Sequence, residues 1–594
     1  MFSVIAVLAA FGAVRGFRFD LTGKGLDLSN TLSFTWLLLF LFFVWTLIRS
    51  KREPDRGVKL SAATFSLLIA VFYSAGLSFE KMKGLGWIWS SRGNLINYLN
   101  LFFSVFILYY CCSFHAFRML RDHPGQTGSG LGSGFSFKKV LLFWVLLQIF
   151  YIPWYLYCYP GVLTYDSGRQ VRDALSVDTL DNHHSALLDL VIRGILLPVK
   201  NLTGSVQIGI GLCTLGQMLI MTFLFAAALE KIFRHTQNRI LQVLVFLWFA
   251  AYPVNNIYSV TMWKDILFAG CVLALMLLLD AASDDEHAFF RSRYRCVFLG
   301  MTLLLLPLLR HNGILISVGM TIYLFFAFKD FRRQVMILCA GWICLFILWN
   351  RVLLPAWHVK PISSSEVLSV PLQQIARALY NHHGELHPNL VAEAESYFTV
   401  PEIWYEYEPL LSDPVKSSFR ASLYEEDPAR FFRLWADLGK RYPFDYLEAF
   451  LHNNYGYWFP ETTYWISSYG VLTGGQIRDL HTAPILKIGI IDRIYNWYAY
   501  HQEEKTPLLP LLFSRGACFW VWLFCGIWCL YRNRRKFILF MPGLFLWGSI
   551  LISPVYNEYR YVYGLFICLP LFLVSALFSK KTGIRLDGRM KVTD

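Results

Sequence analysis

The sequence has few charged residues, and this shortage sets the class of the protein. Only 16% of its 594 residues are Asp, Glu, Lys or Arg, whereas 56% are hydrophobic, and the mean hydropathy is +0.44. About a quarter of the residues of a soluble domain are charged. The composition therefore excludes an ordinary soluble protein and is typical of a chain that crosses a membrane many times.

The sequence also has no cysteine pattern that would hold a small secreted fold together. Nearly all of its twelve cysteines lie inside long apolar runs, and the polar segment 351–510 contains none. We therefore expect no disulfide framework in that segment. No set of Cys and His residues has the spacing of a structural zinc site.

Basic residues are in excess, with a formal net charge of +14, and membrane topology explains this excess. A span needs about 20 mostly apolar residues. Lys and Arg gather in alternate loops between the apolar runs, which the positive-inside rule makes cytoplasmic. We therefore expect a multi-pass plasma-membrane protein with cytoplasmic N- and C-termini, whose basic loops meet anionic lipid rather than nucleic acid. The expected fourteen spans are 2–19, 32–48, 60–78, 98–117, 139–157, 205–229, 239–253, 258–280, 296–309, 313–328, 335–352, 511–530, 537–553 and 559–579.

One long polar insertion divides the chain. In "PLQQIARALYNHHGELHPNLVAEAESYF" apolar residues recur at three- and four-residue spacing, which predicts helices. The prediction is an all-α polytopic membrane protein with a mainly helical extracytoplasmic domain inserted before the last three spans. Its parts are a four-span region with a Gly/Ser-rich cytoplasmic linker (1–138), a membrane core with an outer loop at 158–204 (139–350), the extracytoplasmic domain (351–510), and three spans with a basic tail (511–594).

Ionisable residues stand at the outer ends of several predicted spans. Each costs roughly 2.5–3.5 kcal/mol at membrane depth on insertion scales, so each needs a reason. In "YPGVLTYDSGRQ", Pro160-Gly161 predicts a turn that returns the chain to the bilayer. Asp166 follows this turn and either caps a helix or faces a ligand, and the two roles are compatible.

Two further outer segments each have a structural and a functional interpretation. "DNHHSALLDLVIRGILL" predicts an amphipathic helix on the membrane surface, with Asp189 and Arg193 opposite its apolar stripe. His183 and His184 at its start are either a cap or surface pair, or catalytic groups. The aromatic segment 453–465, "NNYGYWFPETTYW", either forms a domain core or offers flat faces to sugars.

Three other motifs place charges at the starts of spans or in a hairpin. In "MWKD", Lys264 and Asp265 are adjacent and do not face one another on a helix. Asp265 therefore either complements the helix dipole or points into an outer cavity. Arg310 in "LLRHNG" and Arg560 in "YNEYRYVYG" either snorkel to the interface or bind phosphate, which guanidinium groups recognise through paired hydrogen bonds.

The order of these motifs resembles the GT-C type of integral-membrane glycosyltransferases. The shared features are an aspartate in the first large outer loop, a His-bearing amphipathic segment, many spans, and an "RY" followed by proline near the end. This class includes protein mannosyltransferases, aminoarabinose transferases and catalytic subunits of oligosaccharyltransferases. "YPGVLTYDSGRQ", "MWKD" and "LRHNG" are more similar to an uncharacterised bacterial multi-pass group within it. The resemblance covers roughly 139–350 and 511–579.

The resemblance implies an enzyme that moves a sugar from a polyprenyl-phosphate donor to a glycan, lipid or protein acceptor of the cell envelope. Asp166 matches the family's aspartate, which acts as general base or helps to place a divalent cation. Ser167 stands where many relatives have a second acidic residue, the prolines after the His pair are absent, and four spans precede the motif instead of one. The expected catalytic residues are Asp166, His183, His184 and Asp265, and the expected substrate-binding residues are Tyr165, Gln170, Lys264, Arg310, Asn312, Arg560 and Tyr561.

A multi-pass lipid or glycan transporter is the alternative function. Transporters usually show paired repeats and spans broken by Gly or Pro, and no such symmetry is visible in this sequence. The polar motifs also gather on one face instead of following a path through the membrane. A scaffold that binds a partner through its outer domain is a third class, and it would tolerate Asp166→Asn. The sequence favours the glycosyltransferase.

Overall fold

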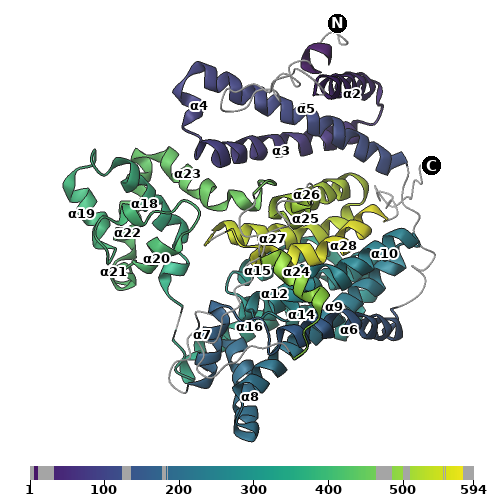
Figure 1. Ribbon diagram of the computed structural model, residues 1–594, viewed down its shortest axis with the longest axis vertical. Coiled ribbons are helices and arrows are strands. Elements are labelled where there is room, and N and C mark those ends of the chain that lie inside the picture. The colour runs from purple at the N-terminus through teal and green to yellow at the C-terminus, as the bar shows by residue number, and fades with distance from the viewer. Residues whose placement is uncertain are drawn as a thin grey trace.

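The computed structural model describes residues 6–10, 32–122, 135–176, 182, 185–360, 362–462, 485–499, 509–552, 554–555 and 557–578 (Figure 1). In these ranges the chain forms helices and three isolated β-bridges, without a strand. The all-α class expected from the composition is confirmed.

Nine of the described helices are long and apolar enough to cross a membrane. The predicted count of fourteen is not confirmed. α15 (Gly313–Ala327) is apolar but shorter, and α2 (Leu32–Arg52), α14 (Arg293–Leu309) and α26 (Arg515–Arg532) fall on predicted spans without joining the nine. The nine are α3 (Arg56–Met82), α5 (Arg92–Asp122), α6 (Phe137–Cys158), α9 (Val206–His235), Arg239–Ser259 with α10 (Arg239–Ala251) and α11 (Pro253–Ser259), α12 (Lys264–Asp284), Lys329–Ala356 with α16 (Arg332–Leu348), Arg534–Ile552 with α27 (Phe540–Ile552), and Tyr559–Leu577 with α28 (Tyr563–Leu577).

Short polar residues fix where several of these helices begin. Asp55 accepts hydrogen bonds from the first backbone N–H groups of α3, Ser205 does so for α9, and Ser514 does so for α26. Such caps satisfy donors that have no partner inside the helix. The cap that starts a helix therefore determines which residues lie at that end of the helix.

The membrane helices share one apolar core, with α12 at its centre. α12 packs against α9, α14 and α28. Because the chain reverses direction between successive helices, the start of α12, the turn between α14 and α15, and the start of α28 all lie at the same end of the bundle.

A separate domain with its own apolar core lies at that end, on the left of Figure 1. The sequence predicts one of its helices closely, since Asp427 caps α22 and Pro428 is its first residue. We call this unit the polar domain, and its end of the bundle the domain side. Its helices are α18 (Ser369–His382), α19 (Pro388–Ser396), α20 (Asp413–Ser417), α21 (Ala421–Glu426), α22 (Pro428–Arg441) and α23 (Pro443–Asn454).

An aromatic segment anchors the polar domain to the membrane helices. Tyr455, Tyr457, Trp458 and Phe459 are buried and belong to the core of the membrane helices. The indole of Trp520 in α26 donates a hydrogen bond to the carbonyl of Trp458 at 2.7 Å. These residues are therefore packed in a core, but it is the core of the membrane helices and not that of the polar domain, whereas 463–465 lie outside the described residues.

The loop after α6 forms two helices, α7 (Tyr165–Leu175) and α8 (Ala186–Thr203), and α8 runs across the direction of α3 and α5 in Figure 1. The prediction that Asp189 lies on an open polar face of α8 is wrong, because its side chain is fully buried. α7 packs along this helix, and the guanidinium group of Arg193 donates to the carbonyl of Ala174 at 3.2 Å. α8 is therefore covered on the side that its sequence pattern leaves polar.

Candidate functional site

The stretch that begins at Pro160 turns back over the membrane helices. Gly161 has a φ of 147°, and the methyl group of Thr214 lies where a side chain at this glycine would begin. Val162 then pairs with the segment before α12, since its N–H donates to the carbonyl of Val260 at 2.9 Å and its carbonyl accepts from the N–H of Met262 at 3.0 Å. Two motifs about one hundred residues apart are thereby held side by side.

Thr164, and not Asp166, caps α7. Thr164 and Ser167 form a capping box, in which the Ser167 hydroxyl accepts from the Thr164 N–H at 3.1 Å. The same hydroxyl donates to the Met262 carbonyl at 2.5 Å. The expectation that Asp166 is the cap is wrong, because a serine three residues after a threonine satisfies the helix start. The carboxylate of Asp166 is instead paired with Arg560.

Arg560 is the partner of Asp166, although 394 residues separate them. Its buried guanidinium group forms ion pairs with Asp166 and Glu558, and it lies 3.7 Å from a carboxylate oxygen of Asp265. The guanidinium carbon also lies 4.8 Å from the ring centroid of Trp263. One arginine thus connects α7, the start of α12 and the segment before α28.

Arg310 joins this arrangement from the turn between α14 and α15. It forms an ion pair with Asp265 at 2.7 Å, and its guanidinium carbon lies 4.1 Å from the ring centroid of Tyr561. Lys264 lies within electrostatic reach of Asp166 and Asp265. We call six side chains the charged cluster, namely Asp166, Lys264, Asp265, Arg310, Glu558 and Arg560.

The structure thus brings together four of the outer motifs that the sequence singles out, namely "YPGVLTYDSGRQ", "MWKD", "LLRHNG" and "YNEYRYVYG". His183 and His184 lie outside the described residues, as does the side chain of Tyr165. Asn312 donates to Ser549 of α27 at 3.2 Å, and Gln170 is buried one helical turn after Asp166. The catalytic and binding roles of these residues stay predictions.

Sequence reasoning missed Arg515, the first residue of α26. Its side chain is only 2% exposed, and its guanidinium group donates to the carbonyl of Asn557 and to the hydroxyl of Thr462 at 3.3 Å. Its position could have revealed it, because Arg515 lies inside the predicted span 511–530, where an arginine is costly and usually has a function. With Arg515 the neighbourhood holds four basic and three acidic side chains among the described residues.

The polar domain holds the short segment that leads into Arg560. The hydroxyl of Ser369 donates to the carbonyl of Pro554 at 2.5 Å, and the N–H of Ser412 donates to the carbonyl of Val555 at 3.0 Å. The domain therefore helps to position Arg560 from one side, while Arg515 holds the same segment from the other.

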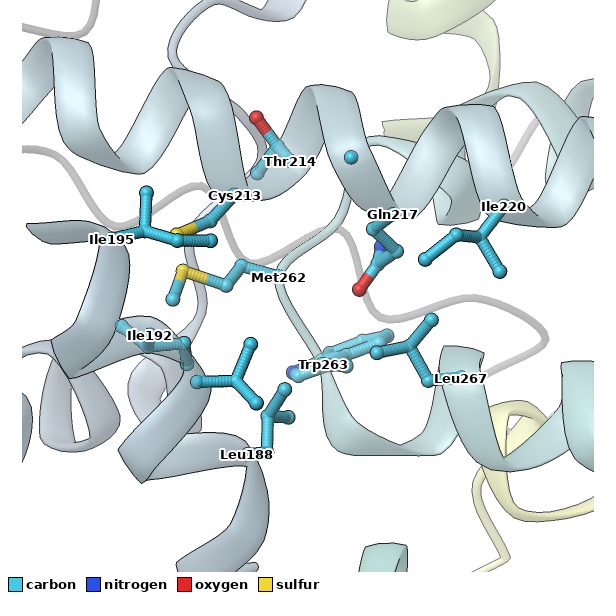
Figure 2. Close-up of a pocket in the computed structure, with 12 residues that line it drawn as sticks. Leu188, Ile192, Ile195, Cys213, Thr214, Gln217, Ile220, Met262, Trp263 and Leu267 are labelled. Atoms are coloured by element: carbon cyan, nitrogen blue, oxygen red, sulfur yellow. The ribbon is translucent and has the colours of Figure 1, made fainter. Parts of the chain in front are cut away.

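An apolar pocket of about 120 Å³ adjoins the charged cluster (Figure 2). Leu188 and Ile192 of α8, Ile220 of α9 and Met262 contribute to its walls. Trp263 belongs to both sites, since its ring lines the pocket and also faces Arg560. The apolar pocket and Arg560, the central cation of the charged cluster, are therefore in contact with the same tryptophan ring.

Comparison with known families gives one match. Residues 174–587 match the family model described as "Family of unknown function (DUF6020)". The chain belongs to the DUF6020 family. No curated protein and no solved structure matches this sequence. The DUF6020 match includes Asp265, Arg310 and Arg560 and begins after Asp166.

One group of side chains in the described part of this DUF6020 chain comes close enough to hold a metal ion, and it lies at the opposite end of the bundle. It consists of His235, Asp280 and Asp284. Lys536 donates to both carboxylates at 2.6 Å, and Lys231 also forms ion pairs with both. Lysines therefore already supply the positive charge that a metal would bring.

Proposed function

We propose that this protein is a glycosyltransferase of the cell envelope. It would move a sugar from a polyprenyl-phosphate donor to a glycan, lipid or protein acceptor at the outer face of the plasma membrane. The observation that carries this proposal is the meeting of Asp166 and Arg560 in a buried charged cluster beside an apolar pocket. The proposal places the domain side of the bundle outside the cell.

The basic side chains suit the phosphate of such a donor. Arg310, Arg515, Arg560 and Lys264 outnumber the three acidic side chains around them by one. Guanidinium groups match phosphate oxygens through paired, charge-assisted hydrogen bonds. Charge that develops on the leaving phosphate is stabilised more strongly in a site without bulk water.

The apolar pocket suits the first part of the donor's hydrocarbon tail. Burying apolar surface contributes about 25 cal/mol per Å². Val191 and Ile220 line the pocket and are also exposed on α8 and α9, so the pocket adjoins the surface that faces lipid. Trp263 lines the pocket and also contacts Arg560. The phosphate of a donor whose tail fills the pocket would therefore lie near the guanidinium group.

Asp166 would act as the general base. Its carboxylate is paired with Arg560, so a donor phosphate that binds Arg560 competes with this pairing and releases the carboxylate. Asp166 then takes the proton of the acceptor hydroxyl, which requires an approach within about 3 Å. The acceptor oxygen bonds to the anomeric carbon, and the bond from that carbon to the phosphate oxygen breaks with its electrons leaving on the lipid phosphate. A divalent cation beside Asp166 remains part of the prediction.

The test is release of lipid phosphate from a panel of polyprenyl-phosphate sugars, followed by mass spectrometry. Membranes would contain the wild type, Asp166→Asn, Arg560→Ala or the exposed control Asp437→Asn. We expect a fall of roughly 10²- to 10⁴-fold for Asp166→Asn, because general-base catalysis contributes that much, and wild-type release for the control. Unchanged release in Asp166→Asn would reject the assignment. Donor movement across sealed vesicles without release would favour the transporter.

A further inference from the structure

Gln170 is a buried amide without a hydrogen-bond partner among the residues that the structure describes. Its side chain is 1% exposed, and neither its nitrogen nor its oxygen makes a hydrogen bond to any residue that the structure describes. More than about 90% of buried polar groups have a partner in protein or ordered water. An apolar side chain at this position would make the protein more stable, because an unpaired buried amide costs free energy of folding. The amide is therefore explained better by binding a ligand than by stabilising the protein.

The position of Gln170 on α7 points to that reason. It follows Asp166 by four residues, so the two side chains lie on one face of the helix, one turn apart. Asp173 follows by three residues and is also buried on this face. A ligand at Gln170 would therefore lie between Asp166, which pairs with Arg560, and Asp173, which pairs with Arg169 at 3.8 Å.

We propose that Gln170 binds a hydroxyl or acetamido group of the transferred sugar. The inference rests on the proposed function and specifies its substrate. An amide is both donor and acceptor, as is a sugar hydroxyl, so the two groups satisfy one another.

The experiment compares the purified full-length wild type with Gln170→Leu and with a matched control. The control is Gln242→Leu, because the Gln242 amide donates to the carbonyl of Thr236 at 2.8 Å beyond the end of α9, away from the charged cluster. Each protein is heated without donor, and lipid-phosphate release is then measured with polyprenyl-phosphate hexose and N-acetylhexosamine donors.

We expect Gln170→Leu to melt at the wild-type temperature or above, because it removes an unpaired buried amide, whereas Gln242→Leu melts lower. Release from both donors falls about 10- to 100-fold in kcat/KM in Gln170→Leu, while Gln242→Leu keeps the wild-type value.

Three results would overturn the inference. A lower melting temperature in Gln170→Leu than in the wild type would show that the amide has a partner in the protein. Unchanged release from both donors in Gln170→Leu would leave the glycosyltransferase standing and reject the role of Gln170. Absence of release by the wild type with all donors would reject the proposed function itself, and the sugar assignment with it.

Discussion

Arg560 takes part in ion pairs with carboxylates from three parts of the chain, namely Asp166, Asp265 and Glu558. Buried charges persist only where partners offset the loss of water, and removal of one partner costs about 3–5 kcal/mol. The arginine and its carboxylates are therefore a unit, and single substitutions in it are expected to affect folding as well as activity. For this reason the tests above combine release rates with melting temperatures.

A histidine in the polar domain predicts sensitivity to acid. Burial of His452 against α3, together with the charges of Arg377 and Lys83, lowers its pKa to about 3. Unfolded histidine has a pKa of about 6.5, so the unfolded state binds the extra proton as the pH falls through and below that value. Stability is full above pH 6.5 and decreases by up to about 1.4 kcal/mol per pH unit between the two pKa values.

Melting curves at pH 7.5 and 5.5 test this expectation in the wild type and in His452→Phe. Phenylalanine keeps the ring contact with Phe79, which lies at 5.0 Å between ring centroids, and removes the proton site. We expect the wild type to lose more stability than His452→Phe over this interval. Equal losses in the two proteins would contradict the argument.

At the scale of helices and their connections, an ionic network joins three elements at the end opposite to the polar domain. Lys231 of α9 and Lys536 of the 3₁₀ helix Arg534–Leu539 both form ion pairs with Asp280 and Asp284 of α12. Lys536→Met keeps the length of the side chain and leaves the carboxylates with less positive charge. We expect a loss of about 3–5 kcal/mol, seen as a lower melting temperature in detergent.

The neighbouring Arg535 provides the control. Its side chain is 60% exposed and lies 3.9 Å from Glu286, a geometry that contributes about 0–1 kcal/mol. Arg535→Met should therefore melt close to the wild type. If Lys536→Met melted as high as Arg535→Met, the network would not stabilise the contact between α12 and the last helices.

The helices could be predicted from sequence because hydropathy and caps are local properties. Asp427 caps α22 as expected, and the apolar runs that form α3, α5, α6 and α9 are evident without any knowledge of packing. The number of spans is harder to predict, because runs such as the one that forms α15 are shorter than a membrane span. The buried Asp189 shows a further limit, because a periodicity argument does not reveal that a second helix covers the polar face.

The candidate site could be predicted in composition but not in contacts. Topology alone places Asp166, Asp265, Arg310 and Arg560 at one end of the bundle. The specific pairing of Asp166 with Arg560 depends on how helices at opposite ends of the sequence pack, which no local pattern encodes. Arg515 was overlooked because it lies within an apolar run and belongs to no recognisable motif.

At the scale of the whole molecule, a short segment of the chain connects the polar domain with the charged cluster. The domain holds Pro554 and Val555, and the chain then enters the membrane at Arg560. Movement of the domain would therefore move the arginine. The side of the membrane on which the domain lies also decides which substrates reach the cluster, so orientation is the property of the whole protein most worth measuring.

Orientation can be measured with two single cysteine substitutions at exposed positions. Lys440→Cys lies in the polar domain, where the native side chain is 79% exposed, and Tyr294→Cys lies at the opposite end of the bundle at a position that is 81% exposed. Because basic loops stay in the cytoplasm, a membrane-impermeant maleimide should label Lys440→Cys at least about tenfold more than Tyr294→Cys in intact cells. Lysis should make the two equal, and the wild type gives the background from native cysteines. Preferential labelling of Tyr294→Cys in intact cells would place the charged cluster on the cytoplasmic face, and transfer at the outer face would then be impossible.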